Sequence, residues 1–185
     1  METTLSHVID VLGAEKLLAK ANCTENALAT PITGADCDSR AAAGNHLFIC
    51  KGQAFRTEFL VSALEAGCVA YLCGEDIAAE LAKVVPDAPA LAVSDVRRAM
   101  GVVSPICWGH PDRRLNILGI TGTKGKSTVA YMLRSILDGD EAYEHAGIMG
   151  SIETFDGVEG FESHNTTPEA PDLWRHLANA ADTGL

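Results

Sequence analysis

Short apolar runs alternate with amphipathic segments through the first half of the chain. The continuous apolar runs cover residues 47–50, 68–73 and 90–93. Their length and their flanking Gly, Pro and charged residues are typical of buried strands. The segments with apolar residues at helical spacing cover residues 59–66, 77–85 and 96–103. Strands that alternate with helices at this spacing predict a small α/β unit.

The flanks of this unit are less regular. Apolar positions over 5–21 follow one face of a helix, interrupted at Gly13, and a polar, irregular stretch continues to Asp36. The segment 105–114 carries two prolines, a glycine and several charges, which is typical of a domain boundary. We therefore expect two domains, residues 1–108 and 109–185.

The second domain opens on another strand and helix pattern. Residues 115–120 predict a strand and 127–137 a helix, whereas 142–161 is Gly-rich and irregular, with room for one short strand around 148–154. Residues 168–181 predict a helix. The residues expected on its apolar face are Leu173, Trp174, Leu177 and Ala178. The expected fold class is α/β for both domains, the second being the start of a phosphate-loop domain.

Composition narrows the function classes. The 185 residues are 47% hydrophobic and 21% charged, which excludes a disordered chain, and the net charge of −11 argues against a nucleic-acid partner. No apolar run approaches the ~18 residues of a membrane span, and the N-terminus lacks a signal-peptide pattern. Six cysteines without a CxxC pair indicate free thiols in a reducing cytosol, and the scattered histidines argue against a zinc site.

The strongest chemical signal is the decapeptide GITGTKGKST at residues 119–128, between the predicted strand and helix. Such a loop offers backbone N–H groups to an anion at a helix N-terminus, and its glycines allow close approach. We expect Lys126 to act on the outer phosphates of ATP as the catalytic cation and the Ser127 hydroxyl to bind Mg²⁺. The predicted nucleotide-binding residues are Gly122, Thr123, Lys124, Gly125, Lys126, Ser127 and Thr128. The competing interpretation is a Gly- and Lys-rich loop without a ligand.

The loop departs from the common phosphate-loop pattern GxxxxGK[ST], because Ile120 stands where that pattern has glycine. TGTKGKST resembles instead the ATP loop of the Mur ligases. Two further blocks narrow the resemblance to the branch that acts on UDP-N-acetylmuramoyl-L-alanyl-D-glutamate, the MurE-type ligases. These blocks are Asp38-Ser39-Arg40 with Gly44, Leu47-Phe48 and Lys51-Gly52, and Asn165-Thr166-Thr167-Pro168-Glu169.

The resemblance implies a first domain that holds the uridine nucleotide and a central domain that binds ATP and Mg²⁺. Ser39 would contact the UDP-sugar, with Gln53 and Ala54 nearby. The substrate's muramoyl-peptide part would meet Asn165, Thr166 and Thr167. Residues 53–56 depart from the commoner family loop, so the exact contacts of the 53–58 loop stay open. A threonine before Pro168 also suits a helix N-cap, a structural role compatible with binding.

By resemblance, the reaction is an ATP-dependent amide ligation that adds a third amino acid, lysine or diaminopimelate, through an acyl phosphate. Family members are more than twice as long. Their magnesium-binding glutamate, carbamylated lysine and C-terminal domain, which takes the amino-acid substrate, have no counterpart here. We therefore expect a cytoplasmic, N-terminal fragment that is inactive alone, of undetermined oligomeric state. A non-catalytic UDP-sugar- or ATP-binding module and another Mur-type ligase stay open as alternatives.

Overall fold

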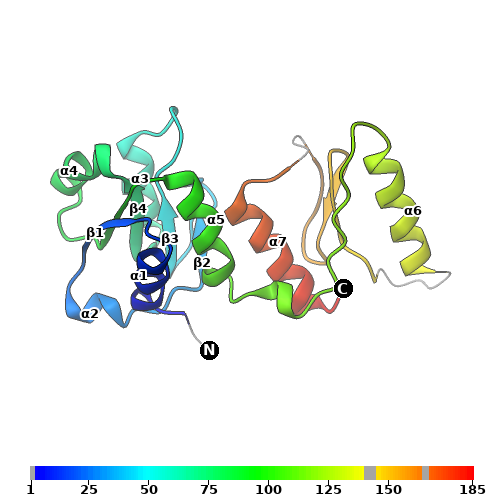
Figure 1. Ribbon diagram of the computed structural model, residues 1–185, viewed down its shortest axis with the longest axis horizontal. Helices are drawn as coiled ribbons and strands as arrows, with labels where there is room; N and C mark the ends of the chain where they lie inside the picture. Colours follow the sequence, from blue (N-terminus) through cyan, green and yellow to red (C-terminus); the bar gives the residue numbers. More distant parts are fainter. Residues whose placement is uncertain (1–2, 140–144, 164–166) are drawn as a thin grey trace. The chain divides into compact units, whose positions relative to one another are not determined.

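The computed structural model describes residues 3–139, 145–163 and 167–185. The chain divides into two compact units, Met1–His110 and Pro111–Leu185, which run from blue to green and from green to red in Figure 1. The division falls inside the segment 105–114. Each unit has its own helices and its own sheet.

The first unit is built on a five-stranded sheet with the strand order β1-β5-β4-β3-β2. Strands β2 to β5 run parallel, and β1 pairs antiparallel with β5 at one edge. The strands are β1 Leu18–Asn22, β2 Gly34–Asp36, β3 His46–Ile49, β4 Ala70–Gly74 and β5 Ala90–Val93. The predicted mixed α/β class is therefore confirmed.

Helices cover this sheet and close its core. They are α1 Leu5–Ala14, α2 Glu25–Leu28, α3 Thr57–Glu65, α4 Glu75–Val84 and α5 Val96–Cys107. Phe48 and Tyr71 of the sheet form a buried cluster with Leu60 of α3 and Leu81 of α4. Because side chains alternate along a strand, the buried Leu72 points to the opposite face, where α5 contacts β2, β3 and β4.

The N-terminal segment differs from the helix predicted over 5–21. Helix α1 ends at Ala14, Lys16 takes a left-handed φ of 58°, and Leu18–Asn22 forms the edge strand β1. The apolar spacing fits either structure, and pairing with β5 decides for the strand. The stretch up to Asp36, predicted to be irregular, contains α2 and β2. Short edge strands give a weak sequence signal because their pairing partners are remote in the chain.

Helix α5 extends to Cys107 and passes through Pro105, beyond the predicted end at Val103. Proline removes one intrahelical hydrogen bond and normally stops a helix. Here the residues around it are buried: Val103 and Ser104 are fully inaccessible, and the Ser104 hydroxyl donates to the Met100 carbonyl at 2.7 Å. Burial of this last turn offsets the lost hydrogen bond.

The second unit combines two long helices with a small antiparallel sheet of strand order β6-β7-β8. Its elements are the 3₁₀ turn η1 Pro111–Arg113, α6 Lys126–Asp138, β6 Ile148–Met149, β7 Glu153–Phe155, β8 Gly160–Glu162 and α7 Ala170–Thr183. The sequence predicted one short strand in this region, and the structure has three. Hydrogen-bonded turns create them: the Gly150 N–H donates to the Glu153 carbonyl, and the Asp156 N–H donates to the Glu159 carbonyl.

Two predictions for the second unit are wrong. Residues 115–120 do not form a strand and join neither sheet in the described part of the chain. Helix α7 begins at Ala170 with Glu169 as N-cap, so Thr167 does not cap it. A start at Pro168 would put Pro171 where the first intrahelical N–H is needed, whereas the observed start puts it within the first two positions.

The apolar face of α7 also differs from the predicted one. The buried residues of this helix are Pro171, His176, Leu177 and Ala180. Of the four residues predicted for that face, only Leu177 is buried, and Leu173, Trp174 and Ala178 are partly exposed. A polar residue, His176, takes the central buried position because Asp156 of the neighbouring turn accepts its ring N–H.

Candidate functional site

The predicted phosphate loop leads directly into α6 in the second unit. Gly125, the N-cap residue, has a left-handed φ of 79°, and Gly122 has a φ of 151°. No described side chain caps the helix, and the Val129 N–H is the first to donate within it, to the Gly125 carbonyl. The preceding N–H groups therefore sit at the positive end of a 13-residue helix, an arrangement that suits an anion.

Two side chains of α6 complete the donor set of this loop. The Lys126 ammonium donates to the Gly122 carbonyl at 2.8 Å. This hydrogen bond holds the positive charge of Lys126 against the loop. The Ser127 hydroxyl oxygen lies 3.3 Å from the hydroxyl oxygen of Ser151. Backbone N–H groups, an ammonium and a hydroxyl fit a phosphate chain together with a hard, oxygen-binding cation. ATP with Mg²⁺ is therefore compatible with the residues present.

The remaining predicted loop residues share the same accessible position. Gly122, Thr123, Lys124, Gly125 and Thr128 are all exposed, and Lys126 and Ser127 are partly exposed. The seven predicted nucleotide-binding residues are thus contiguous and open to solvent. Whether they bind ATP stays a prediction.

In the first unit, Ser39 and the Gln53-Ala54 pair follow two adjacent parallel strands. Ser39 is partly exposed and lies shortly after β2, whereas Gln53 and Ala54 are exposed and lie shortly after β3. Because β2 and β3 are parallel neighbours, both segments lie at the same edge of the sheet. Ligands in open α/β sheets commonly bind outside the carboxyl ends of the strands.

An ion pair shapes the turn that holds Ser39. The Arg40 side chain donates to both carboxylate oxygens of Asp38, with Nη2 at 2.6 Å from Oδ2, and the Arg40 backbone N–H donates to Oδ1 at 3.0 Å. These hydrogen bonds and the arginine charge lower the pKa of Asp38. Asp38 and Arg40 thus flank Ser39 in the sequence and form an ion pair with each other.

The third predicted binding segment is described only in part. Thr167 is exposed and lies ahead of α7. Asn165 and Thr166 lie outside the described residues.

Comparison with known proteins bears on both units. Residues 120–185 match the Mur ligase middle domain. The chain is 37% identical over 148 residues to the UDP-N-acetylmuramoyl-L-alanyl-D-glutamate–L-lysine ligase of Streptococcus thermophilus, covering 80% of this chain and 29% of that protein. It is 35% identical over 156 residues to the UDP-N-acetylmuramyl-tripeptide synthetase of Bifidobacterium longum, covering 84% and 29%. Residues 120–185 are thus a Mur ligase middle-domain segment. The resemblance inferred from the motifs is confirmed.

A solved Mur ligase has the same fold. The structure of a UDP-N-acetylmuramoyl-L-alanyl-D-glutamate–2,6-diaminopimelate ligase matches 100% of this chain and 34% of its own length, with a TM-score of 0.67 and 20% sequence identity. The chain spans about 29% of the length of the curated Mur ligases it matches. No helix in the described part of the chain is long and apolar enough to cross a membrane.

A cluster of possible metal ligands in the second unit has a structural role. Asp156, Glu159 and His176 place one ligand atom each within 4.8 Å of one another. Asp156 Oδ2 already lies 2.6 Å from His176 Nδ1 and accepts from the Asn179 amide at 2.8 Å, and Glu159 forms an ion pair with Arg175. We therefore assign this cluster to packing of α7.

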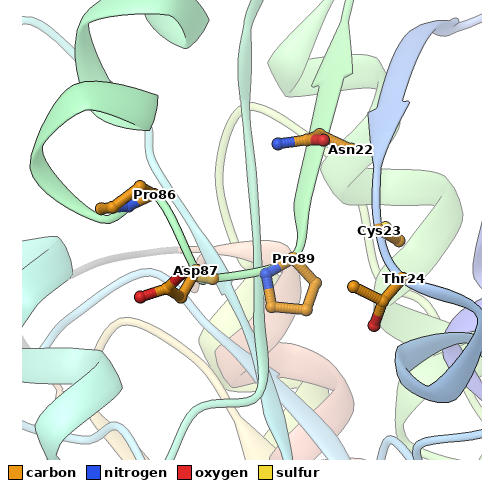
Figure 2. A pocket seen from close by; sticks show the side chains of 7 residues that line it. Asn22, Cys23, Thr24, Pro86, Asp87 and Pro89 are labelled. Atoms are coloured by element: carbon orange, nitrogen blue, oxygen red, sulfur yellow. The ribbon is translucent and has the colours of Figure 1, made fainter.

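A pocket at the edge of the first unit is separate from the predicted site residues. It is lined by Cys23 and Thr24 after β1 and by residues 86–89 before β5 (Figure 2). None of the residues predicted from the motifs lines it. The pocket follows from the turn geometry of the β1 and β5 edge and carries no assignment.

The cysteines are free thiols, as the sequence predicts. All six lie in the described part of the chain and none forms a disulfide. Cys50, Cys68, Cys73 and Cys107 are buried, and burial raises the pKa of Cys73 to about 11. These thiols are packing residues.

Sequence reasoning missed Ser151 as a neighbour of the phosphate loop. It lies in the turn between β6 and β7, 24 positions after Ser127. A Gly-Ser pair in a glycine-rich stretch is common in turns and carries no signal of its own. Only the folded meander brings it to the start of α6.

Proposed function

We propose that this chain carries the UDP-sugar-binding and phosphate-loop segments of an ATP-dependent amide ligase of peptidoglycan precursor synthesis. The substrate would be UDP-N-acetylmuramoyl-L-alanyl-D-glutamate, and the reaction would attach a third amino acid, lysine or diaminopimelate. The observation that carries this proposal is sequence identity that extends across both units. The chain is 37% identical to a ligase named for that substrate and 35% identical to a synthetase named for the tripeptide product. A cytoplasmic location follows from the nucleotide substrates.

The second unit, with residues 109–185 as the domain predicted from the sequence, is proposed to bind ATP and Mg²⁺. Lys126 would leave the Gly122 carbonyl, now 2.8 Å away, and place its ammonium on the outer phosphates. The N–H groups at the start of α6 would hold phosphate oxygens, and the Ser127 hydroxyl would offer a lone pair to Mg²⁺. These groups supply positioning and positive charge where negative charge develops during phosphoryl transfer.

The first unit, with residues 1–108 as the predicted domain, is proposed to bind the UDP-sugar. Ser39, Gln53 and Ala54 lie at the carboxyl edge of β2 and β3, which supports a shared contact surface. Thr167, with Asn165 and Thr166, is proposed to contact the muramoyl-peptide part. Hydroxyl and amide groups suit the amide and carboxylate oxygens of that ligand.

Calorimetric titration of the 185-residue chain tests both halves. The chain is titrated with UDP-N-acetylmuramoyl-L-alanyl-D-glutamate and, separately, with Mg-ATP. We expect Ser39→Ala to weaken only the UDP ligand and Lys126→Ala to weaken only Mg-ATP, so that each variant controls the other. Ser62→Ala, an exposed serine on α3, is the matched control for Ser39 and should bind both ligands as the wild type does.

The outcomes separate the competing functions. Binding of both ligands, each lost in its own variant, supports the ligase proposal. Binding of Mg-ATP without the UDP ligand would instead indicate a nucleotide-binding module and would withdraw the roles of Ser39 and Thr167. Failure to bind either ligand would overturn the proposal for the chain.

A further inference from the structure

A serine outside the phosphate loop lies next to its proposed metal-binding hydroxyl. Ser151 Oγ is 3.3 Å from Ser127 Oγ, and either oxygen can be the donor in the absence of a ligand. Ser151 is exposed and sits in the turn between β6 and β7, so it is not buried as part of a core. The contact joins the start of α6 to a separate element of the second unit.

Other interactions hold this turn against α6. The Gly150 N–H donates to the Glu153 carbonyl at 3.0 Å, which closes the turn around Ser151. Arg134 of α6, only 14% exposed, donates to the Glu153 carboxylate at 2.6 Å and lies over the Phe155 ring at 4.9 Å. The position of Ser151 beside α6 therefore does not depend on the two hydroxyls alone.

The chemistry of a metal-bound hydroxyl gives this contact a direction. A serine hydroxyl has one proton and two lone pairs, and an oxygen that gives a lone pair to a cation must send its proton elsewhere. Hydrogen bonds of this kind orient metal ligands and tune their strength. The neighbouring Lys126 ammonium is a donor only and cannot receive that proton. Ser151 Oγ can receive it from its observed position.

We propose that Ser151 is a positioning residue for Mg²⁺ in the nucleotide site. Its hydroxyl oxygen accepts the hydrogen bond of the Ser127 hydroxyl and thereby turns a Ser127 lone pair toward the cation. The inference rests on the proposed ATP-binding function of the loop. It assigns Ser151 a role that depends on the cation and not on the phosphates.

Binding of ATP to the full 185-residue chain, with and without Mg²⁺, tests this assignment. Dissociation constants are measured by calorimetry in excess Mg²⁺ and in excess EDTA for the wild type, Ser151→Ala and Ser151→Thr. We expect Ser151→Ala to weaken binding about tenfold in Mg²⁺ and to leave binding in EDTA unchanged. Ser151→Thr keeps the hydroxyl and should restore most of the Mg²⁺-dependent affinity.

Two controls make the result specific. Ser135→Ala removes an exposed hydroxyl from α6 and should bind as the wild type does in both conditions. Ser127→Ala should lose at least as much Mg²⁺-dependent affinity as Ser151→Ala. Far-UV circular dichroism and thermal unfolding of each variant check that the fold is retained.

Failure of the Ser151 inference and failure of the proposed ATP-binding function give different results. Equal affinity of Ser151→Ala and wild type in Mg²⁺, or an equal loss in Mg²⁺ and in EDTA, would overturn the role of Ser151 and leave the ATP site standing. A wild-type chain that binds no ATP, or one in which Lys126→Ala has no effect, would overturn the proposed function and this inference with it.

Discussion

Among the residues of the second unit that the structure describes, Asp156 and His176 form the most buried side-chain ion pair, with Oδ2 and Nδ1 2.6 Å apart and side-chain exposures of 2% and 4%. Asp156 follows β7, and His176 lies in the middle of α7. The Asn179 amide donates to the same carboxylate oxygen at 2.8 Å, and the Val158 and Glu159 N–H groups donate to the other. One carboxylate thus joins a sheet turn to a helix.

Replacing this carboxylate should destabilise the second unit. We expect Asp156→Ala to lower its free energy of unfolding by about 3 kcal/mol, because buried donors lose a charged acceptor. Trp174 lies on α7 and Trp108 in the first unit, so urea unfolding followed by fluorescence in a Trp108→Phe background reports the second unit.

The matched control for this variant is an exposed aspartate in the same unit. Asp182→Ala removes an exposed ion pair with Arg114 and should cost less than about 1 kcal/mol. Similar unfolding midpoints for the two aspartate variants would contradict the role given to Asp156.

Acid should weaken the same contact. Burial tends to raise the pKa of Asp156, but hydrogen bonds from the Glu159 N–H, His176, Asn179 and the Val158 N–H outweigh it and lower the pKa. A lowered folded-state pKa gives stability that is present above the unfolded-state value near 3.8 and is lost as the pH falls through the folded-state value.

The pH dependence can be measured with the same fluorescence signal. We expect the unfolding midpoint of the second unit to fall below about pH 4 in the wild type, and to fall less in Asp156→Asn. The asparagine keeps the shape of the side chain but does not titrate. Parallel acid profiles for the two proteins would assign the acid sensitivity to other carboxylates.

The parts of the fold that the sequence predicted are those whose signal is local. Strands β3, β4 and β5 are buried on both faces and therefore stand out as continuous apolar runs. The edge strand β1 and the short β2 were missed, because only their pairing with remote strands defines them. Residues 115–120 show the reverse case, an apolar run that belongs to neither sheet in the described part of the chain.

The same distinction holds for the candidate site. Residues 122–128 are contiguous, so residue type and spacing alone indicate an anion site. Ser151 and the Asp156–His176 contact depend on the turns of the β6–β8 meander, which a glycine-rich stretch does not specify in advance. Sequence reasoning therefore found the loop and missed the residues that surround it.

A glycine in β2 should be intolerant of substitution. A Cβ built on Gly34 would lie 2.5 Å from the ring of His46, its neighbour in β3. The ring cannot move freely, since it hydrogen-bonds to Asp36 at 2.6 Å and packs edge-on against Trp108. We expect Gly34→Ala to destabilise the first unit by about 1–3 kcal/mol, measured by urea unfolding through Trp108 fluorescence in a Trp174→Phe background.

A second glycine provides the opposite control. Gly13 lies in α1, and a Cβ there would meet nothing within 4 Å. Gly13→Ala should therefore stabilise the first unit by about 0.5–1 kcal/mol through helix propensity. Two results would show that the clash is not the cause. One is a stabilising effect of Gly34→Ala. The other is that Gly34→Ala costs as much unfolding free energy in a His46→Ala background, where the ring is absent, as it does in the wild type.

Helix α6 exposes an apolar stripe that should control how strongly the second unit binds hydrophobic dyes and associates in water. The stripe comprises Val129, Met132 and Ile136, spaced three and four residues apart, with exposures of 44%, 60% and 74%. None of the residues of α6 is buried. Contiguous apolar surface of this kind binds hydrophobic dyes and promotes association in water. We expect Met132→Lys/Ile136→Lys to lower dye fluorescence and the tendency to associate, without loss of helix content.

The stripe prediction can be separated from effects on folding. Leu177→Lys places the same charge at a buried position of α7 and should unfold the second unit, which raises dye fluorescence. Dye titration and sedimentation velocity at several protein concentrations compare these variants with the wild type. Met132 and Ile136 lie outside the predicted nucleotide-binding residues 122–128, so the double lysine variant should keep its affinity for Mg-ATP if the loop binds it. Unchanged dye binding in that variant would show that the exposed apolar surface lies elsewhere.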